Sequence, residues 1–229
     1  MKTIGMLGGM SWESTLSYYR ALNLGVKNAL GGLHSAKILL NSVDFAEIEA
    51  LQHAERWDET ALILADAAVA LEAAGADFLM ICTNTMHKVA PQVQARINIP
   101  LLHIADATAS VLRKDGVKKV GLLGTRFTME QDFYRERIQG QGIEVLVPNS
   151  DARDLVHEVI YEELCLGKIN AESKAQFLNI VDALAGAGAE AVILGCTEIA
   201  LLIQQEDTHV PLYDTTAIHA EQAVLFALS

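Results

Sequence analysis

The chain has 229 residues, of which 51% are hydrophobic and 20% charged, and its formal net charge is −12. This composition is typical of a folded globular protein and excludes a disordered chain. The acidic balance excludes a nucleic-acid partner, because phosphate binding needs a basic patch, and it disfavours binding to an anionic membrane.

Other features of the whole sequence bear on compartment and cofactors. No apolar run reaches the roughly 18 to 20 residues that a membrane-spanning helix needs, and the first apolar run is too short for a signal peptide. The three cysteines lack the spacing of a disulfide framework. The sequence contains no dinucleotide-binding glycine motif, no P-loop and no zincin helix. We therefore expect a soluble cytoplasmic protein with neither a metal nor a cofactor.

Short apolar runs typical of β-strands alternate along the chain with segments of helical periodicity. The strand-like runs are 3–7, 36–40, 78–81, 101–104, 120–123, 145–147, 192–194 and 211–213. Helical periodicity is clearest over 57–74, 174–187 and 216–228, and Asp106 is a candidate N-cap for a helix that ends at 114–116. This alternation predicts an α/β protein with parallel sheets covered by helices.

An internal repeat indicates that the fold is duplicated. Residues 2–8 (KTIGMLG) resemble 118–124 (KKVGLLG), 74–81 (AGADFLMI) resemble 187–194 (AGAEAVIL), and 99–102 (IPLL) resemble 210–213 (VPLY). We expect two pseudo-symmetric, doubly wound domains, one formed by 1–102 with 212–229 and the other by 103–211. Because ligands bind at the carboxyl ends of parallel strands, the active site is expected in the cleft between the domains.

The repeat aligns Thr83 with Cys196, and each residue follows an apolar strand. One group from each half would suit a 1,1-proton transfer, in which one removes an α-proton and the other donates to the opposite face. We expect the Cys196 thiolate to be favoured by the start of a helix, although a free cysteine is also a common buried hydrophobe. Thr197 and Glu198 would hold substrate, orient Cys196 or simply cap a helix.

Residues 194–199 (LGCTEI), 8–10 (GGM) and 83–87 (TNTMH) resemble the motifs of the aspartate/glutamate racemase family, and the likeness covers essentially the whole chain. Residues 9–13 (GMSWE) and 82–88 (CTNTMHK) are shared with a subgroup of enterobacterial amino-acid racemases. The resemblance implies a PLP-independent racemase, an isomerase, that acts on L-aspartate, L-glutamate or a wider set of amino acids and forms a homodimer. It implies catalysis by Thr83 and Cys196, and it implies that the substrate carboxylate is held by Asn84, Thr85 and backbone groups near Met10 and Thr125.

The sequence departs from the family pattern at the first catalytic position. A cysteine usually precedes the Asn-Thr pair, whereas here Thr83 stands there and Cys82 is one residue earlier. A shift of one residue on a strand points a side chain to the opposite face, so we expect Cys82 in the core. A hydroxyl is a far weaker acid than a thiol, and we therefore expect the two faces of the substrate to react unequally.

Recognition of the substrate side chain is a second departure. Ile48 and Cys165 stand where aspartate-selective relatives carry an arginine and a lysine. Gln52 is our first candidate for this role, with Arg56 and Lys168 as alternatives. A glutamate racemase would carry histidine at position 198.

Other interpretations stay open. Relatives of this fold include hydantoin racemases, single-cysteine decarboxylases and cis-trans isomerases, and a one-cysteine chemistry at Cys196 stays open because Thr83 replaces the first cysteine. A non-catalytic amino-acid-binding protein would keep the cleft and would have lost one catalytic group. Thr125 would serve equally as a plain N-cap. His87, His103 and His219 are expected to be hydrogen-bonded structural residues rather than ligands or acids.

Overall fold

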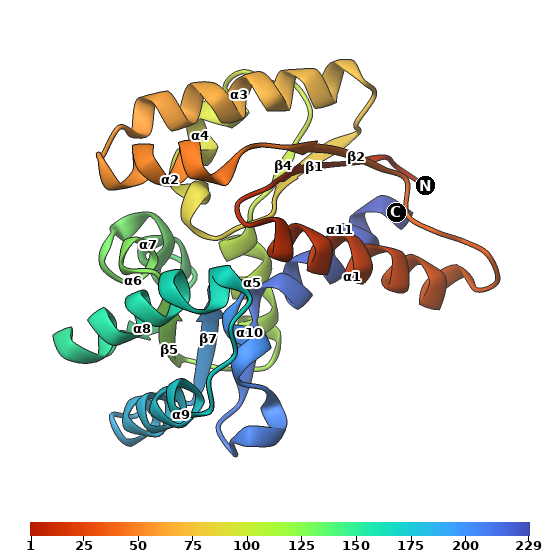
Figure 1. Ribbon diagram of the computed structural model, residues 1–229. Coiled ribbons are helices and arrows are strands. Elements are labelled where there is room, and N and C mark those ends of the chain that lie inside the picture. Colours follow the sequence, from red (N-terminus) through yellow and green to blue (C-terminus); the bar gives the residue numbers. More distant parts are fainter. The chain divides into compact units, whose positions relative to one another are not determined.

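The computed structural model describes all 229 residues, with strands and helices alternating along the chain (Figure 1). All eight predicted strands are present: β1 (Ile4–Gly8), β2 (Ile38–Ser42), β3 (Phe78–Ile81), β4 (Leu101–Leu102), β5 (Lys119–Gly124), β6 (Glu144–Leu146), β7 (Ala191–Gly195) and β8 (Leu212–Asp214). They form two four-stranded, all-parallel sheets, with the orders β2-β1-β3-β4 and β6-β5-β7-β8. The predicted α/β class with two parallel sheets is confirmed.

The two sheets have equivalent registers, as the internal repeat predicts. In the first sheet Ile4 pairs with Phe78, and in the second Val120 pairs with Ala191. The repeat equates Ile4 with Val120 and Phe78 with Ala191. The strand pairs β3/β4 and β7/β8 correspond in the same way, through Leu79–Leu101 and Val192–Leu212.

Packing divides the chain into two compact units, of which the first comprises Met1–Ile104 and His219–Ser229. Its helical elements are α1 (Trp12–Leu30), α2 (Phe45–His53), α3 (Trp57–Ala73), the 3₁₀ turn η1 (Thr85–Val89), α4 (Ala90–Gln94) and most of α11 (Thr215–Leu228). Figure 1 shows α3 on one face of the sheet and α1 with α11 on the other. The last helix packs in the first unit, where Ala223 and Val224 lie in the same core cluster as Ile4 and Met6.

The second unit comprises Ala105–Ile218. Its remaining elements are α5 (Ile104–Lys114), α6 (Arg126–Glu130), α7 (Asp132–Gln139), α8 (Ser150–Glu162), η2 (Leu164–Leu166), α9 (Ala171–Gly186), α10 (Ile199–Leu202) and η3 (Gln205–Asp207). The domain boundaries expected from the sequence, after residues 102 and 211, stay a prediction.

One helix start was predicted wrongly. Asp106 does not cap α5, which begins at Ile104, directly after β4, and Asp106 instead lies in the first turn. Its carboxylate accepts a hydrogen bond from Arg137 Nε at 2.7 Å. Two residues expected in the fourth strand therefore lie outside β4, and Ile104 is already helical.

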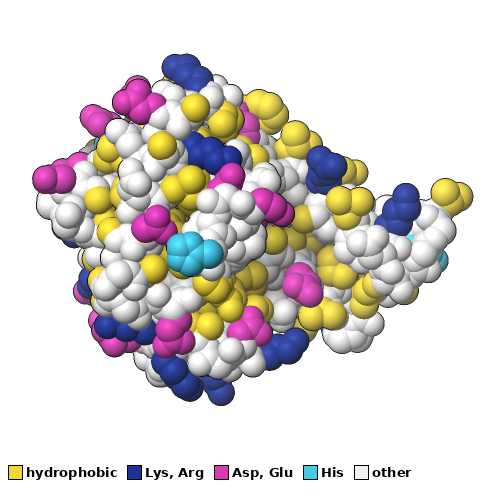
Figure 2. Space-filling model, turned by 90° about the horizontal axis from the view of Figure 1, so that it is seen from below, with side chains coloured by type: hydrophobic (Ala, Val, Ile, Leu, Met, Phe, Trp, Pro, Cys, Tyr) yellow, Lys and Arg dark blue, Asp and Glu magenta, His cyan; other side chains and the backbone are white.

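Charge is dispersed over the surface. On the face drawn in Figure 2, acidic and basic side chains are interspersed. Many of the basic residues pair with neighbouring carboxylates, as in Arg96–Asp66 and Arg135–Asp132. None of the helices combines the length and the apolar character needed to cross a membrane.

Candidate active site

The first group of predicted site residues lies at the carboxyl edge of the first sheet. The chain leaves β1 toward β2 on one side and later enters β3 on the other side, so the order of connection reverses between β1 and β3. Ligands of open α/β sheets bind outside the strand ends at such a reversal. Gly9 and Met10 follow β1, and Thr83 follows β3, whose Ile81 is paired with Leu7. The structure therefore brings the Met10 turn and the Thr83 loop to one edge.

The start of α1 fixes both strand ends. Ser11 caps the helix by accepting a hydrogen bond from the Ser14 amide, and the Gly9 amide donates to Thr15 Oγ1 at 2.8 Å. Ser14 Oγ donates to the Cys82 carbonyl at 2.8 Å, directly before Thr83. Sequence reasoning missed this role of Ser14; the signal was a small hydroxyl residue in the first helical turn after a glycine-rich strand end.

Cys82 lies in the core, as predicted. Phe78 and Met80 point to the α1 and α11 side of β3, and Cys82 continues their alternation into the same core cluster. Its side chain is fully buried, and this burial raises the pKa of the Cys82 thiol far above its usual value. A thiol in this setting does not ionise near neutral pH.

Gln52 lies against the loop that carries Asn84 and Thr85. Its side chain is buried in α2, with 2% of the residue exposed, and its amide nitrogen is 2.9 Å from Met86 Sδ. Asn84 and Thr85 are buried as well. Gln52 therefore contacts the buried loop that carries Thr83, Asn84 and Thr85.

The alternative side-chain ligands lie in other settings. Arg56 donates from Nε and Nη2 to the two Glu59 carboxylate oxygens, and both residues are exposed. Lys168 Nζ is 3.5 Å from the Glu162 carbonyl in the second unit. Ile48 is part of the apolar core formed with α3.

The second group of predicted residues occupies the corresponding edge of the second sheet, where the order of connection reverses between β5 and β7. Thr125 follows β5 and Cys196 follows β7, whose Gly195 is paired with Gly124. Thr125 caps α6, since its hydroxyl accepts a hydrogen bond from the Thr128 amide at 3.3 Å. The capping role anticipated for Thr125 is therefore present.

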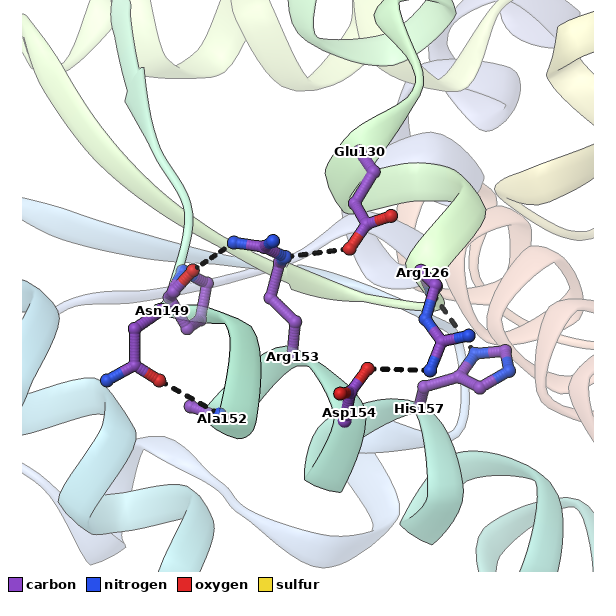
Figure 3. Close-up of polar contacts among 8 residues, drawn as sticks. Arg126, Glu130, Asn149, Ala152, Arg153, Asp154 and His157 are labelled. Carbon is purple, nitrogen blue, oxygen red and sulfur yellow. Dashed lines mark hydrogen bonds and ion pairs between the residues drawn. The ribbon is translucent and has the colours of Figure 1, made fainter.

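The helix α8 holds α6, and with it the Thr125 turn, in place (Figure 3). Three contacts join α8 to α6: Arg126 Nη2 to Asp154 Oδ1 (2.6 Å), the Arg126 amide to His157 Nδ1 (3.2 Å) and Arg153 Nε to Glu130 Oε1 (2.8 Å). Arg153 Nη1 also donates to the Pro148 carbonyl in the loop before α8 (2.8 Å). The half-exposed ion pairs contribute little free energy individually, but together they fix the position of this short helix.

The Cys196 side chain is hydrogen-bonded to Glu198. The thiol donates to Glu198 Oε2 at 3.0 Å, and the Thr197 hydroxyl donates to the same oxygen at 2.6 Å. Burial, the Glu198 carboxylate and the neighbouring Cys165 raise the pKa of the Cys196 thiol well above its usual value. The prediction of a thiolate at a helix start is therefore wrong. Burial and the adjacent carboxylate disfavour the charged form, and the following α10 has only four residues.

This arrangement can move a proton. The resting state is a thiol whose proton already points at a carboxylate oxygen, and transfer along that hydrogen bond would create the thiolate. A thiolate next to a neutral carboxylic acid avoids the like-charge repulsion that raises the Cys196 pKa. Glu198, whose role the sequence left open, is thus in direct contact with the candidate catalytic sulfur.

Comparison with known proteins agrees with these motifs. The model of the Asp/Glu/hydantoin racemase family matches residues 7–223. The chain belongs to this family of racemases. It is 25% identical to the broad specificity amino-acid racemase RacX of Bacillus subtilis over 96% of both chains. Among solved structures, a candidate Asp/Glu racemase from Yersinia pestis is 53% identical with a TM-score of 0.93, and an aspartate racemase homologue from Pyrococcus horikoshii is 37% identical with a TM-score of 0.86, each over the full length of both chains.

Proposed function

We propose that the protein is a PLP-independent amino-acid racemase in which Thr83 and Cys196 exchange the α-proton on opposite faces of one substrate carbon. The substrate is an acidic amino acid, L-aspartate or L-glutamate, or a wider set of amino acids. Membership of the racemase family supports the reaction class, and the two residues named here extend it to a mechanism.

The observation that carries the proposal is the equivalence of the two positions. Thr83 and Cys196 correspond in the repeat, and each follows the strand next to the reversal point of its sheet. The strand registers that lead to them are also equivalent. Two proton carriers at related positions of a duplicated unit match a reaction that needs one carrier for each face.

The proposed reaction begins with the transfer of the Cys196 proton to Glu198. The thiolate then takes the Cα proton, and the electron pair left on Cα is delocalised into the substrate carboxylate. The Thr83 hydroxyl gives its proton to the opposite face, which inverts the centre. Thr83 then regains a proton from solvent, and Glu198 releases the proton it took from Cys196 to solvent, so that the resting state is restored. Because a hydroxyl is a weaker acid than a thiol, the Thr83 step is the slower one.

The polar groups beside Thr83 support substrate binding in the first unit. The Gln52 amide offers a hydrogen-bond donor to a side-chain carboxylate without a charge, which fits the absence of the arginine and lysine expected in aspartate-selective relatives. An uncharged donor discriminates less strongly between acidic and neutral amide side chains than a cation does. We therefore propose Gln52, Asn84 and Thr85 as substrate ligands, together with Met10, Thr125, Thr197 and Glu198.

A one-thiol reaction is the second candidate. The observation that favours it is the state of Cys196, a protonated thiol whose pKa is raised by burial and by Glu198. A thiol of this kind suits proton delivery to a carbanion after decarboxylation, and Thr83 would then only bind substrate. This enzyme would release carbon dioxide and give a product without an α-carboxylate.

One experiment separates the candidates. The protein is incubated in D2O with L-aspartate or L-glutamate, and Cα–H is followed by proton NMR and enantiomers by chiral chromatography. We expect Cα deuteration with both enantiomers at equilibrium, and a rate about 100- to 10,000-fold lower for Cys196→Ala, the range for loss of a general base. Binding without exchange would indicate a binding protein, and carbon dioxide release a decarboxylase.

A further inference from the structure

His87 links the loop that carries Thr83 to the chain segment that follows β4. It lies in η1 with 1% of the residue exposed. Its Nδ1 is 2.7 Å from the Thr83 carbonyl oxygen, and the Ile104 amide donates to its Nε2 at 3.2 Å. The ring therefore bridges two backbone groups that are 21 residues apart in the sequence.

These two contacts fix the protonation state of the ring. A backbone amide can only donate, so Nε2 accepts and carries no proton. The Thr83 carbonyl can only accept, so Nδ1 carries the proton and donates. Protonation of Nε2 would break the bond to Ile104, and a shift of the proton from Nδ1 to Nε2 would break both bonds. The geometry thus requires a neutral His87 in a single tautomer.

The hydrogen bond from His87 to the Thr83 carbonyl affects the direction of the Thr83 side chain. Ser14 holds the carbonyl of the peptide group before Thr83, and His87 holds the carbonyl of the peptide group after it. Peptide groups are planar and rigid, so holding both carbonyl oxygens restrains the φ and ψ angles of the residue between them. The Cα–Cβ bond of Thr83, and with it the range open to its hydroxyl, is then set by two buried side chains.

Two further histidines surround the ring and exclude water from it. The His103 ring centroid is 4.5 Å from that of His87, and the His219 centroid is 5.8 Å away. His219 Nε2 donates to the Leu102 carbonyl, and its Nδ1 is 3.0 Å from the Tyr18 hydroxyl oxygen. Burial lowers the pKa of His219 to about 4, so this ring is neutral near pH 7 and its Nδ1 accepts from Tyr18. In this dry surrounding a hydrogen bond is stronger than one exposed to water.

The fold itself does not require a histidine at this place. The repeat equates His87 with Ala200 of the second unit, where the same strand-to-turn connection follows β7. There the side chain of the catalytic candidate Cys196 is itself hydrogen-bonded to Glu198. A small residue is therefore sufficient for the turn, and the imidazole is specific to the unit that carries the hydroxyl.

We propose that His87 is a positioning residue for Thr83, which its neutral ring anchors to Ile104 so that the hydroxyl is directed at the substrate. The inference rests on the proposed racemase function. It assigns His87 to one face of the reaction only, because Cys196 is held by different groups. Loss of the anchor should slow proton transfer at the Thr83 face and leave the Cys196 face unchanged.

A matched pair of variants tests the two hydrogen bonds of His87 separately. The amide of His87→Asn reaches the place of Nδ1 and retains a donor for the Thr83 carbonyl, whereas the amide of His87→Gln reaches the place of Nε2 and retains only the contact with Ile104. Cα–H exchange in D2O is measured from each enantiomer separately. The enantiomer whose exchange survives in Thr83→Ala reports the Cys196 face, and the other reports the Thr83 face.

We expect His87→Gln to slow exchange at the Thr83 face by about 10- to 100-fold, as small misplacements of catalytic groups do, with little change at the Cys196 face. His87→Asn should restore most of the lost rate. Equal losses at both faces, or no loss at either, would overturn the inference. Absence of any exchange in the unaltered protein would instead contradict the racemase function.

A second measurement needs no variant. Nitrogen NMR of protein labelled with ¹⁵N-histidine distinguishes the two neutral tautomers and the cation of each ring. We expect the His87 signals of a neutral ring protonated on Nδ1 near neutral pH. A ring protonated on Nε2, or a charged ring, would overturn the proposal even if both variants failed to fold.

Discussion

At the scale of single residues, the two catalytic candidates differ in how they are held. The Cys196 thiol donates a hydrogen bond to Glu198, two residues along the chain, whereas the backbone of Thr83 is held by Ser14 and His87. A thiol with a raised pKa must lose its proton to a neighbouring group before it can act as a base, and Glu198 is the carboxylate in contact with Cys196. The two candidates are therefore held in different ways at equivalent positions of the repeat.

Glu198→Gln tests this role. The amide keeps the size of the side chain but removes the negative charge that, after burial, raises the pKa of Cys196, so the thiolate should form at a lower pH than in the unaltered protein. The rate of iodoacetamide alkylation as a function of pH reports this shift, in a Cys165→Ser background so that the reactive cysteine is Cys196. Racemisation should nevertheless fall by about 100-fold, because the amide cannot accept the proton.

The control is Thr197→Val, which removes the second hydrogen bond to Glu198 and keeps the carboxylate. Its alkylation profile should not move to lower pH. If Glu198→Gln racemised amino acids as fast as the unaltered protein, Glu198 would not be the base for Cys196.

At the scale of elements, the turn after β1 restricts which residue can stand at position 9. Gly9 has a φ of +93°, and a Cβ built there would collide with the backbone nitrogen and oxygen of Val43. The Val43 amide donates a hydrogen bond to the Gly8 carbonyl at 3.0 Å, and a movement of Val43 would break this hydrogen bond beside the paired ends of β1 and β2. The Met10 turn at the candidate site depends on this close approach.

Gly9→Ala should therefore destabilise the protein by more than the strain of a positive φ alone. Gly75→Ala is the matched control, since Gly75 has a φ of +98° and no atom within 4 Å of a built Cβ. We expect about 1 to 2 kcal/mol for Gly75→Ala and at least about 2 kcal/mol more for Gly9→Ala, measured by urea unfolding. Equal losses would show that the contact with Val43 relaxes freely.

The elements also show how far sequence patterns reach. The apolar runs predicted all eight strands. The signal is continuous in strands that are buried on both faces, such as β1, β3 and β7. Helix starts depend on local backbone geometry, and Asp106 was wrongly placed as a cap because a polar residue in the first turn gives the same pattern. The state of Cys196 depends on burial and on the direction of Glu198, which no pattern in the sequence encodes.

At the scale of the whole molecule, a residue near the end of the chain completes the core of the first unit. His219 belongs to α11 and is fully buried. Its ring is hydrogen-bonded to the Tyr18 hydroxyl in α1 and to the Leu102 carbonyl at the end of β4. Burial lowers the pKa of His219 to about 4. Segments that are distant in sequence thus meet at a group that must stay neutral in the folded protein.

This neutrality predicts a pH dependence of stability. The unfolded chain binds a proton at His219 below its usual pKa of 6.5, while the folded protein resists protonation until about pH 4. The contribution is fully present above the unfolded pKa and is lost as pH falls through this window, by about 2 kcal/mol between pH 7.5 and 5. His219→Gln can still donate to Leu102 and does not titrate.

We therefore expect the free energy of unfolding of the unaltered protein to fall by about 2 kcal/mol more than that of His219→Gln over the same change of pH. Urea unfolding followed by tryptophan fluorescence measures both, and the other titrating groups cancel in the difference. Parallel pH profiles would mean that the folded state accepts a proton at His219 readily.

The chain order of the two units has a consequence for biosynthesis. The second unit is one continuous segment, Ala105–Ile218, whereas the first needs residues from His219 onward to fill its core. Domains fold as their residues leave the ribosome, so the second unit has all its parts first, and the first unit must wait with an open core until α11 emerges. During that interval the apolar faces of α1 and the first sheet are exposed to nascent-chain chaperones. The half that carries the thiol is thus ready before the half that carries the hydroxyl.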